Sequence, residues 1–396
     1  MKRYDFDKQI QRRHTNSVKW DTVGEGVLPM WVADMDFETA PAVLKALRKR
    51  VEHGVFGYTK VPDEFYEAIT QWFSRRHGWH IEKEWILYTS GVVPAVSAII
   101  KALTQPGDAV LIQTPVYNCF FSSIRNNGCT LAENKLVYHD NTYTIDFDDF
   151  ERQCAREDVK VFLLCNPHNP VGRVWTQAEL QKMGNICIRH NVVIISDEIH
   201  CELAMPEYKF IPMGSISPEI QRNCVTCVSP SKAFNIAGLQ ISVIISDDAE
   251  LRSKIDKALN VNEVCDVNPF GVLALIAAYN EGEEWLDSLR EYLYGNYKAL
   301  CDFFREQMPC ISVVRLEGTY LVWADCSCLG TSDAITARLE SEGKVLVNSG
   351  TMYGSPDADG FIRINIACPR QQMMEGLRRI HAVLSQLMNN HPELAN

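Results

Sequence analysis

Long apolar runs, an excess of positive charge and an apolar leader are all missing from this sequence. No uninterrupted apolar stretch approaches the roughly 20 residues that a membrane-spanning helix needs, so we expect no membrane span. The first residues, "MKRYDFDKQIQRRH", contain no apolar segment of a secretory signal. With 39 basic against 50 acidic residues, the net charge of -11 argues against a nucleic-acid or anionic-membrane partner. We therefore expect a cytoplasmic protein.

Two motifs that would indicate a metal or a dinucleotide are incomplete. Cys224 and Cys227 form one C-x-x-C, but a zinc site would need a second one. The pair falls in a predicted strand, where residues three apart point to opposite faces, so we interpret both as structural thiols. "VGEGVL", around Gly24 and Gly26, lacks a preceding strand and a third glycine. The fourteen cysteines are scattered, as is typical of reduced thiols in a long intracellular chain.

What the chain does contain is a regular alternation of apolar runs and helical patterns. Runs that are apolar at successive positions predict strands buried on both faces, and they occur at 85–89, 109–113, 159–165, 191–196, 224–229 and 240–246. Helical patterns at 94–105 and 176–190 lie between them. This alternation predicts an α/β fold with a mostly parallel sheet between helices.

A chain of 396 residues exceeds the size at which single cores stop growing, so we expect two domains. From about residue 285 the pattern changes, because long helical segments flank a few strands such as 319–325 and 361–367. We predict a large domain over residues 50–285. The N-terminal arm, residues 1–49, and residues 286–396 should form a smaller α/β domain.

Polar side chains follow five of the predicted strands at their carboxyl ends. They are Ser90 to Val93, Thr114 to Tyr117, Asn166 to Gly172, Asp197 to His200, and Ser229 to Lys232. Because ligands of open parallel sheets bind beyond the carboxyl ends of the strands, these groups predict one shared site.

The lysine and serines of this set suit a carbonyl and a phosphate. A desolvated Lys232 loses its proton readily and becomes a nucleophile toward a carbonyl, whereas a lysine at an ordinary helix start would stay solvated. Ser90 and Gly91 precede a helix whose free N–H groups would face a phosphate. Ser229 and Ser231 offer hydroxyl donors, although helix capping explains serines equally well.

Asp197 and Tyr117 suit a flat ring that carries a positive charge. Asp197 ends an apolar strand, where a carboxylate needs a cationic partner such as a protonated pyridine nitrogen. Tyr117 can stack on such a ring, or it can be a core tyrosine. An aldehyde, a phosphate and a pyridine together describe pyridoxal 5'-phosphate (PLP).

The sequence resembles fold-type I PLP enzymes of the class I and II aminotransferase superfamily, and most of all their cystathionine β-lyase branch of the MalY/PatB type. The resemblance covers nearly the whole chain. It rests on "LPMWVADMDF" (28–37), "GYT" (57–59), "SGVVPAV", "TPVY", "NPHNPVG", "SDEIH", "SPSKAFNIAGLQ" and "RINIA". "WVADMDF" and "DEIH" are the segments that favour the lyase branch.

The resemblance implies a role for each matching residue. Lys232 is the Schiff-base lysine, Asp197 pairs with the pyridine nitrogen, and Asn169 bonds the phenolic oxygen. His200 takes the place where many aminotransferases carry a tyrosine, and Tyr117 stacks on the ring. Positions that match the phosphate site are Gly91, Val92, Val93, Ser229 and Ser231. Arg363 clamps the substrate α-carboxylate with its two-donor fork.

The resemblance also implies a homodimer, because Tyr58 matches a tyrosine that reaches across a subunit interface. One position departs from the aminotransferase pattern: Gln240 replaces the arginine that neutralises the phosphate. The lyase branch tolerates this change. We therefore expect a PLP-dependent carbon–sulfur β-lyase of amino-acid metabolism that cleaves cystathionine or related cysteine conjugates. An aminotransferase and a regulatory binding protein with secondary lyase activity remain the alternatives.

Overall fold

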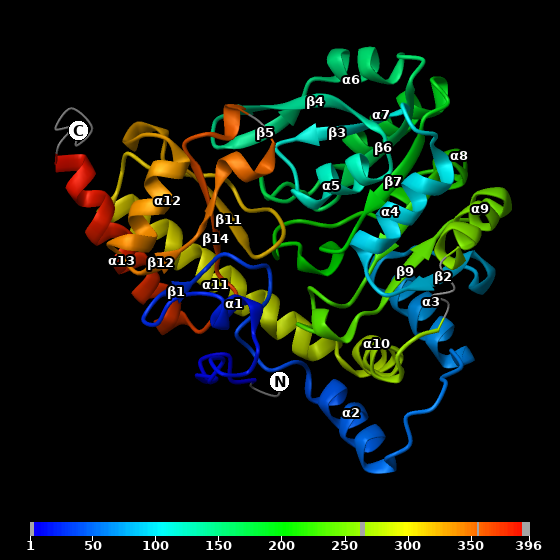
Figure 1. The fold of residues 1–396 in the computed structure, drawn as a ribbon, viewed down its shortest axis with the longest axis horizontal. Coiled ribbons are helices and arrows are strands. Elements are labelled where there is room, and N and C mark those ends of the chain that lie inside the picture. Colours follow the sequence, from blue (N-terminus) through cyan, green and yellow to red (C-terminus); the bar gives the residue numbers. More distant parts are fainter. Residues whose placement is uncertain (1–3, 262–265, 355, 390–396) are drawn as a thin grey trace.

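An eight-stranded sheet forms the centre of the larger part of the molecule (Figure 1). The structure, a computed structural model, describes residues 4–261, 266–354 and 356–389. In spatial order the strands are β2 (Ile86–Thr89), β9 (Ser242–Ile245), β8 (Cys224–Val228), β7 (Val193–Asp197), β6 (Val159–Cys165), β3 (Ala109–Thr114), β4 (Thr130–His139) and β5 (Thr142–Ile145). From β8 to β4 the neighbours are parallel. The prediction of a mostly parallel sheet is confirmed.

Strand β9 departs from the parallel pattern, since it is antiparallel to both β8 and β2. The chain returns from β8 to β9 through residues 229–241, which form turns and η4 (Ala237–Leu239) but no α-helix. A parallel crossover usually carries a helix, so a connection without one is typical of antiparallel neighbours. Because two reversals cancel, β2 still ends at the same edge of the sheet as β8.

Helices cover both faces of the large sheet. One face packs on α4 (Val92–Leu103), α5 (Cys119–Asn126) and α9 (Ala249–Asn260). The other face packs on α6 (Phe147–Cys154), α7 (Gln177–Arg189) and α8 (Pro218–Arg222). Cys224 contributes to the core on one face and Cys227 to the core on the other, as the strand period requires. The interpretation of the pair as two diverging structural thiols is confirmed.

The predicted helices at 94–105 and 176–190 form as α4 and α7, with ends shifted by one or two residues. Helix α7 begins with a capping box: the Thr176 hydroxyl accepts from the Glu179 N–H, and the Glu179 carboxylate accepts from the Thr176 N–H. This exchange satisfies two of the N–H groups that a helix start leaves free. Helix α4 begins at Val92, directly after Gly91 as its N-cap, and it has no side-chain cap at the mouth of the predicted site.

A four-stranded antiparallel sheet forms the second, smaller layer of strands, in the order β10 (Ser312–Val313), β11 (Leu321–Asp325), β14 (Phe361–Asn365) and β13 (Asn348–Ser349). Its helices are α12 (Ser332–Ser341) and α13 (Arg370–Asn389), and β1 (Leu28–Pro29) pairs with β12 (Val345–Leu346) nearby. Figure 1 shows the long α11 (Glu283–Gln307) running from α10 (Pro269–Glu281) toward this smaller part.

The N-terminal region adds α1 (Val18–Asp21), α2 (Pro41–His53) and α3 (Asp63–His77). The expected domain boundary between residues 49 and 50 falls inside α2, which packs against α10. One buried cluster also joins strands of both sheets, so the hydrophobic core does not divide at the expected positions. The division into residues 50–285 and the rest stays a prediction. Within the described ranges, no helix has both the length and the apolar character needed to cross a bilayer.

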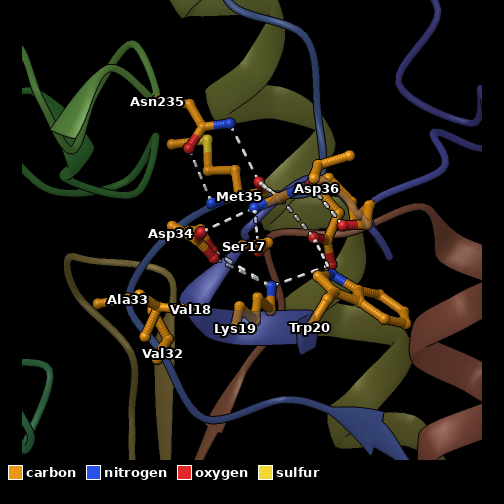
Figure 2. A network of polar contacts seen from close by, with 12 residues as sticks. Ser17, Val18, Lys19, Trp20, Val32, Ala33, Asp34, Met35, Asp36 and Asn235 are labelled. Atoms are coloured by element: carbon orange, nitrogen blue, oxygen red, sulfur yellow. Dashed lines mark hydrogen bonds and ion pairs between the residues drawn. The ribbon is translucent and has the colours of Figure 1, made fainter. Parts of the chain in front are cut away.

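A buried ion cluster fixes the segment from Trp31 to Asp36, which we call the crossing segment (Figure 2). Lys19 is 1% exposed, and its Nζ lies 2.9 Å from Asp36 Oδ2 and 3.5 Å from Asp34 Oδ1. Burial lowers the pKa of Lys19, but the carboxylates of Asp36 and Asp34 together raise it above its usual value. Arg12 bonds both carboxylates as well, at 2.8 Å and 3.0 Å. The crossing segment is therefore held by buried charges.

We expect Lys19→Met to lower the free energy of unfolding by about 3–5 kcal/mol, because it leaves buried carboxylates without one of their cations. Urea titration of the purified variant measures this loss. Lys8→Met is the matched control: Lys8 pairs with Glu38 at 2.7 Å, but both side chains are about half exposed. An exposed pair contributes at most about 1 kcal/mol, so equal losses in the two variants would contradict the prediction.

Candidate active site

The carboxyl ends of five strands surround a cavity of about 200 Å³. Strands β2, β3, β6, β7 and β8 end at this edge of the sheet, and the loops after them carry the predicted groups. Of the predicted site residues, those that line the cavity are Gly91, Val92, Val93, Tyr117, Asn169, Asp197, His200, Ser231 and Lys232. Ala33 of the crossing segment lines it as well. The structure thus brings together most of the residues that the sequence singled out.

Lys232 lies in the turn after β8, and its Nζ donates to the Ala33 carbonyl oxygen at 2.7 Å. Burial and then the positive charge of Arg363 lower the pKa of the amine to about 8, while Asp34 and Asp197 oppose this shift. An amine with this pKa is neutral in a useful fraction of molecules near neutral pH. It can therefore act as a nucleophile or as a base.

Asp197 is the last residue of β7 and is 4% exposed. Burial raises its pKa to about 7, although the Ile199 N–H, 3.1 Å from Oδ1, and the Lys232 amine oppose the shift. Among the described residues, the carboxylate has a single backbone donor, which is little compensation for a buried charge. A cation in the cavity would stabilise it.

Arg363 enters the site from β14 of the smaller sheet. Its Nη1 donates to Asn169 Oδ1 at 2.9 Å and its Nη2 to the Trp31 carbonyl at 2.8 Å. The guanidinium carbon lies 5.1 Å from the centre of the Tyr353 ring, and the buried Nε has no hydrogen-bond partner within the described chain. Arg363 does not itself line the cavity, but its contact with Asn169 puts it directly behind the cavity wall.

His200 is 3% exposed, and its Nδ1 has no partner among the described residues. Burial, together with the charges of Lys232 and Arg363, lowers its pKa to about 3, so the imidazole is neutral. Its ring meets Tyr320 edge to face at 6.1 Å. A neutral imidazole at the cavity wall can donate one hydrogen bond to an oxygen of a ligand.

The start of α4 forms the end of the cavity that suits an anion. Gly91 is its N-cap, and Val92 and Val93 lie in its first turn, where N–H groups are free and the helix dipole is positive. Ser231 lines the cavity, but Ser229 does not. The Ser229 hydroxyl donates to the Ile241 carbonyl at 2.7 Å and accepts from the Ser231 N–H. The phosphate role of Ser229 stays a prediction, and its hydroxyl proton is donated to the Ile241 carbonyl.

Tyr58 lies outside the cavity of its own chain. It is 98% exposed, on the extended segment between α2 and α3, and Val55 and Phe56 beside it are more than half exposed. The structure does not bring Tyr58 to the other site residues. Its predicted role therefore depends on a second copy of the chain.

Ala33 and Tyr320 are two residues at the site that sequence reasoning missed. Ala33 contributes a main-chain carbonyl, and Tyr320 donates to the same oxygen at 2.9 Å. A carbonyl group is common to every residue, so no residue type could have indicated it. Tyr320 stands in the apolar run of a strand, and its pattern is that of a core residue.

The residues present fit the PLP that the sequence predicts. A ring nitrogen would meet the poorly compensated Asp197, an aldehyde would meet Lys232, and a phosphate would meet the start of α4. Groups of three or more side chains arranged to hold a metal ion are absent from the part of the chain that the structure describes.

Comparison with known proteins places the chain in a family. A model of aminotransferases of class I and II matches residues 25–380. Cystathionine β-lyase PatB of Bacillus subtilis is 43% identical over 96% of this chain and all of its own length. A PLP-bound C–S lyase from Staphylococcus hominis is 35% identical, with a TM-score of 0.91 over 97% of this chain and 99% of its own.

A second solved structure, a PLP-bound putative aminotransferase from Clostridium difficile, is 43% identical with a TM-score of 0.94, covering 96% of this chain and all of its own. The expected fold and the expected resemblance are thus both confirmed. Because this family model matches most of its length, the chain belongs to the class I and II aminotransferases.

Proposed function

We propose that the protein is a PLP-dependent carbon–sulfur β-lyase. Its substrates would be cystathionine or related cysteine S-conjugates, which it would cleave to a thiol, pyruvate and ammonia. The observation that carries the proposal is the shared cavity of Lys232 and Asp197, an amine of lowered pKa beside a carboxylate of raised pKa. Full-length similarity to PatB and to a PLP-bound C–S lyase supports the same chemistry.

When bound, PLP supplies an aldehyde that captures the substrate amine and a ring that accepts the electrons of the broken Cα–H bond. Lys232 takes the Cα proton, because its amine is partly neutral and close to the cavity. Asp197 holds a proton on the ring nitrogen, since a buried carboxylate favours a cation beside it. Arg363 binds the α-carboxylate through its fork and orients Cα toward Lys232.

The outcome depends on what leaves Cβ. With cystathionine, the electron pair freed at Cα forms a double bond to Cβ and expels the homocysteine thiolate, which takes up a proton. One water then completes the balance and releases pyruvate and ammonia. Without a leaving group, Lys232 would still hold and return the proton, and with PLP as the acceptor of the amino group the outcome would be a transamination. The aminotransferase is therefore the second candidate, and the similar structure from Clostridium difficile carries that name.

An assay without any keto acid separates the two candidates. We expect the purified protein to convert cystathionine continuously into pyruvate, ammonia and homocysteine, because elimination returns the cofactor unchanged. Coupled lactate dehydrogenase follows the pyruvate, and a thiol reagent follows the homocysteine. A reaction that stalls after one half-turnover and resumes when a keto acid is added would identify a transaminase and contradict the lyase.

The same assay tests Arg363. In Arg363→Lys the positive charge remains but the planar two-donor grip is lost, and a charge-assisted hydrogen bond contributes roughly 1.5–3 kcal/mol. Catalytic efficiency should therefore fall about 10- to 100-fold, while the PLP absorbance stays unchanged. Arg305→Lys, at a side chain that is 70% exposed, is the control and should behave as the wild type.

Reduction of the cofactor onto the protein tests the role of Lys232. We expect the purified protein to be yellow and to lose this colour on borohydride treatment, because the aldehyde of PLP is held by a lysine. Peptide mapping should then find the pyridoxyl group on Lys232. An adduct on Lys209 or Lys254, with Lys232 unmodified, would rule out the assignment.

We also propose that the protein acts as a homodimer in the cytoplasm, with Tyr58 completing the site of the partner. The exposure of Tyr58, Val55 and Phe56 on one extended segment supports an interface there, since such apolar surface is usually covered. The cytoplasmic location rests on the sequence and stays a prediction.

Mixing two inactive variants tests this arrangement. Tyr58→Phe and Lys232→Ala should each have strongly reduced activity, and a mixture allowed to exchange subunits should regain activity. The reason is that each mixed dimer then holds one site with an intact Lys232 and an intact partner Tyr58. Failure to regain activity in proven mixed dimers, or a fully active monomer in sedimentation, would remove Tyr58 from the site.

A further inference from the structure

One carbonyl oxygen of the crossing segment receives two unusual donors. The Ala33 oxygen lies 2.7 Å from Lys232 Nζ and 2.9 Å from Tyr320 Oη. Ala33 lines the cavity, whereas Tyr320 is fully buried and directly precedes β11 of the smaller sheet. The oxygen thus joins the reactive amine of the large sheet to a tyrosine of the small one.

The crossing segment is fixed on both sides of this carbonyl. The Trp31 oxygen accepts from Arg363 Nη2 at 2.8 Å, and Asn365 Nδ2 donates to the oxygens of Val32 and Asp34 at 2.5 Å and 2.7 Å. Figure 2 shows the far end of the segment, where Lys19 and Trp20 point to Asp34 and Asp36, and Asn235 bonds the Met35 main chain. The position of the Ala33 oxygen is therefore set by many contacts.

We propose that Tyr320 is a positioning residue for the reaction: it holds the Ala33 carbonyl so that this oxygen receives the Lys232 amine whenever the amine is free. This inference rests on the proposed function, because only a lysine that is released from the cofactor during the reaction needs a separate hydrogen-bond acceptor. Tyr320 itself does not line the cavity.

A carbonyl suits this task better than a carboxylate. The free amine must hold the Cα proton for a time and then release it. A carbonyl oxygen stabilises the ammonium by one hydrogen bond, while a carboxylate in contact would retain the proton. Because the Ala33 oxygen also accepts a hydrogen bond from Tyr320, it stabilises the Lys232 ammonium less than an oxygen with one donor would. Burial raises the pKa of Tyr320, so its hydroxyl remains a donor at any working pH.

The charges around the amine come from several elements. Arg363 of β14 lowers the pKa of Lys232, whereas Asp34 of the crossing segment, Asp197 of β7 and Cys119 of α5 raise it. The buried His200 is neutral beside them. Removing the Tyr320 hydroxyl leaves all of these charges in place, so a change in the titration of Lys232 would report the shared carbonyl alone.

Titration of Lys232 in the cofactor-free protein is the direct test. We expect Tyr320→Phe to raise the pKa of Lys232 by up to about one unit, because an oxygen that is no longer shared is a better acceptor for the ammonium. Competitive labelling over a pH series, read by mass spectrometry of the Lys232 peptide, measures this pKa. Tyr279→Phe is the matched control: Tyr279 is 1% exposed and its hydroxyl has no partner among the described residues. Its titration curve should equal that of the wild type.

Exchange of the Cα proton of L-alanine in heavy water provides the second readout, since alanine has no leaving group at Cβ. In the PLP-loaded Tyr320→Phe variant the exchange rate near neutral pH should fall about 2- to 12-fold, as expected for one hydrogen bond, and its pH profile should move upward with the Lys232 pKa. Alanine affinity should stay within about 2-fold, because Arg363 is untouched.

An unchanged or lowered pKa of Lys232 would overturn the proposal, as would slower exchange that retains the wild-type pH profile. The outcome is separate from that of the proposed function. A wild-type protein that releases no pyruvate from cystathionine would refute the lyase, while the titration of Lys232 in the cofactor-free variant would still decide the role of Tyr320.

Discussion

The rest of the site depends on burying the Lys232 amine while its pKa stays close enough to neutral pH for it to gain and lose a proton. Burial alone would lower the pKa of Lys232, and the nearby Arg363 adds to this effect. Asp34 and Asp197 oppose it, and the Ala33 carbonyl gives the amine an uncharged acceptor. The four groups come from three separate parts of the chain: the crossing segment, the end of β7, and β14. The two sheets and the N-terminal arm must therefore pack together before the lysine becomes reactive.

The crossing segment connects these parts through its main chain. Its carbonyls accept hydrogen bonds from Lys232 on the large-sheet side and from Arg363 and Asn365 on the small-sheet side. The buried pair of Lys19 and Asp36 then fixes the end of the segment. Since breaking a buried ion pair costs several kcal/mol, charges outside the cavity help to set the geometry inside it.

The sequence predicted the features that depend on residues close together in the chain. Apolar runs indicated the strands of the large sheet, and polar residues at their carboxyl ends indicated Asp197, Asn169 and Lys232 as members of one site, which the structure brings together. Features that depend on packing were not predictable. Strand β9 runs antiparallel to its neighbours after a connection that holds no α-helix, and the place of α2 follows from its contact with α10. The phosphate role expected of Ser229 stays a prediction, and its hydroxyl donates to the Ile241 carbonyl, a contact that the sequence does not indicate. The Ala33 carbonyl has no sequence signal at all.

The site offers different chemistry to the two anionic groups of the proposed reaction. For a substrate carboxylate, Arg363 would supply a full charge on a rigid fork that contacts Asn169 and the Tyr353 ring. For the phosphate, Gln240 stands where an arginine is common, and Lys232 is the only lysine or arginine among the described residues that line the cavity. The N–H groups at the start of α4 and the helix dipole, equivalent to roughly half a positive charge, remain as donors there. Another arginine beside the phosphate would add a second positive charge near Lys232 and lower its pKa further. The uncharged Gln240 adds no such charge, and burial and Arg363 lower the pKa of the Lys232 amine to about 8, at which it can both take a proton and release it.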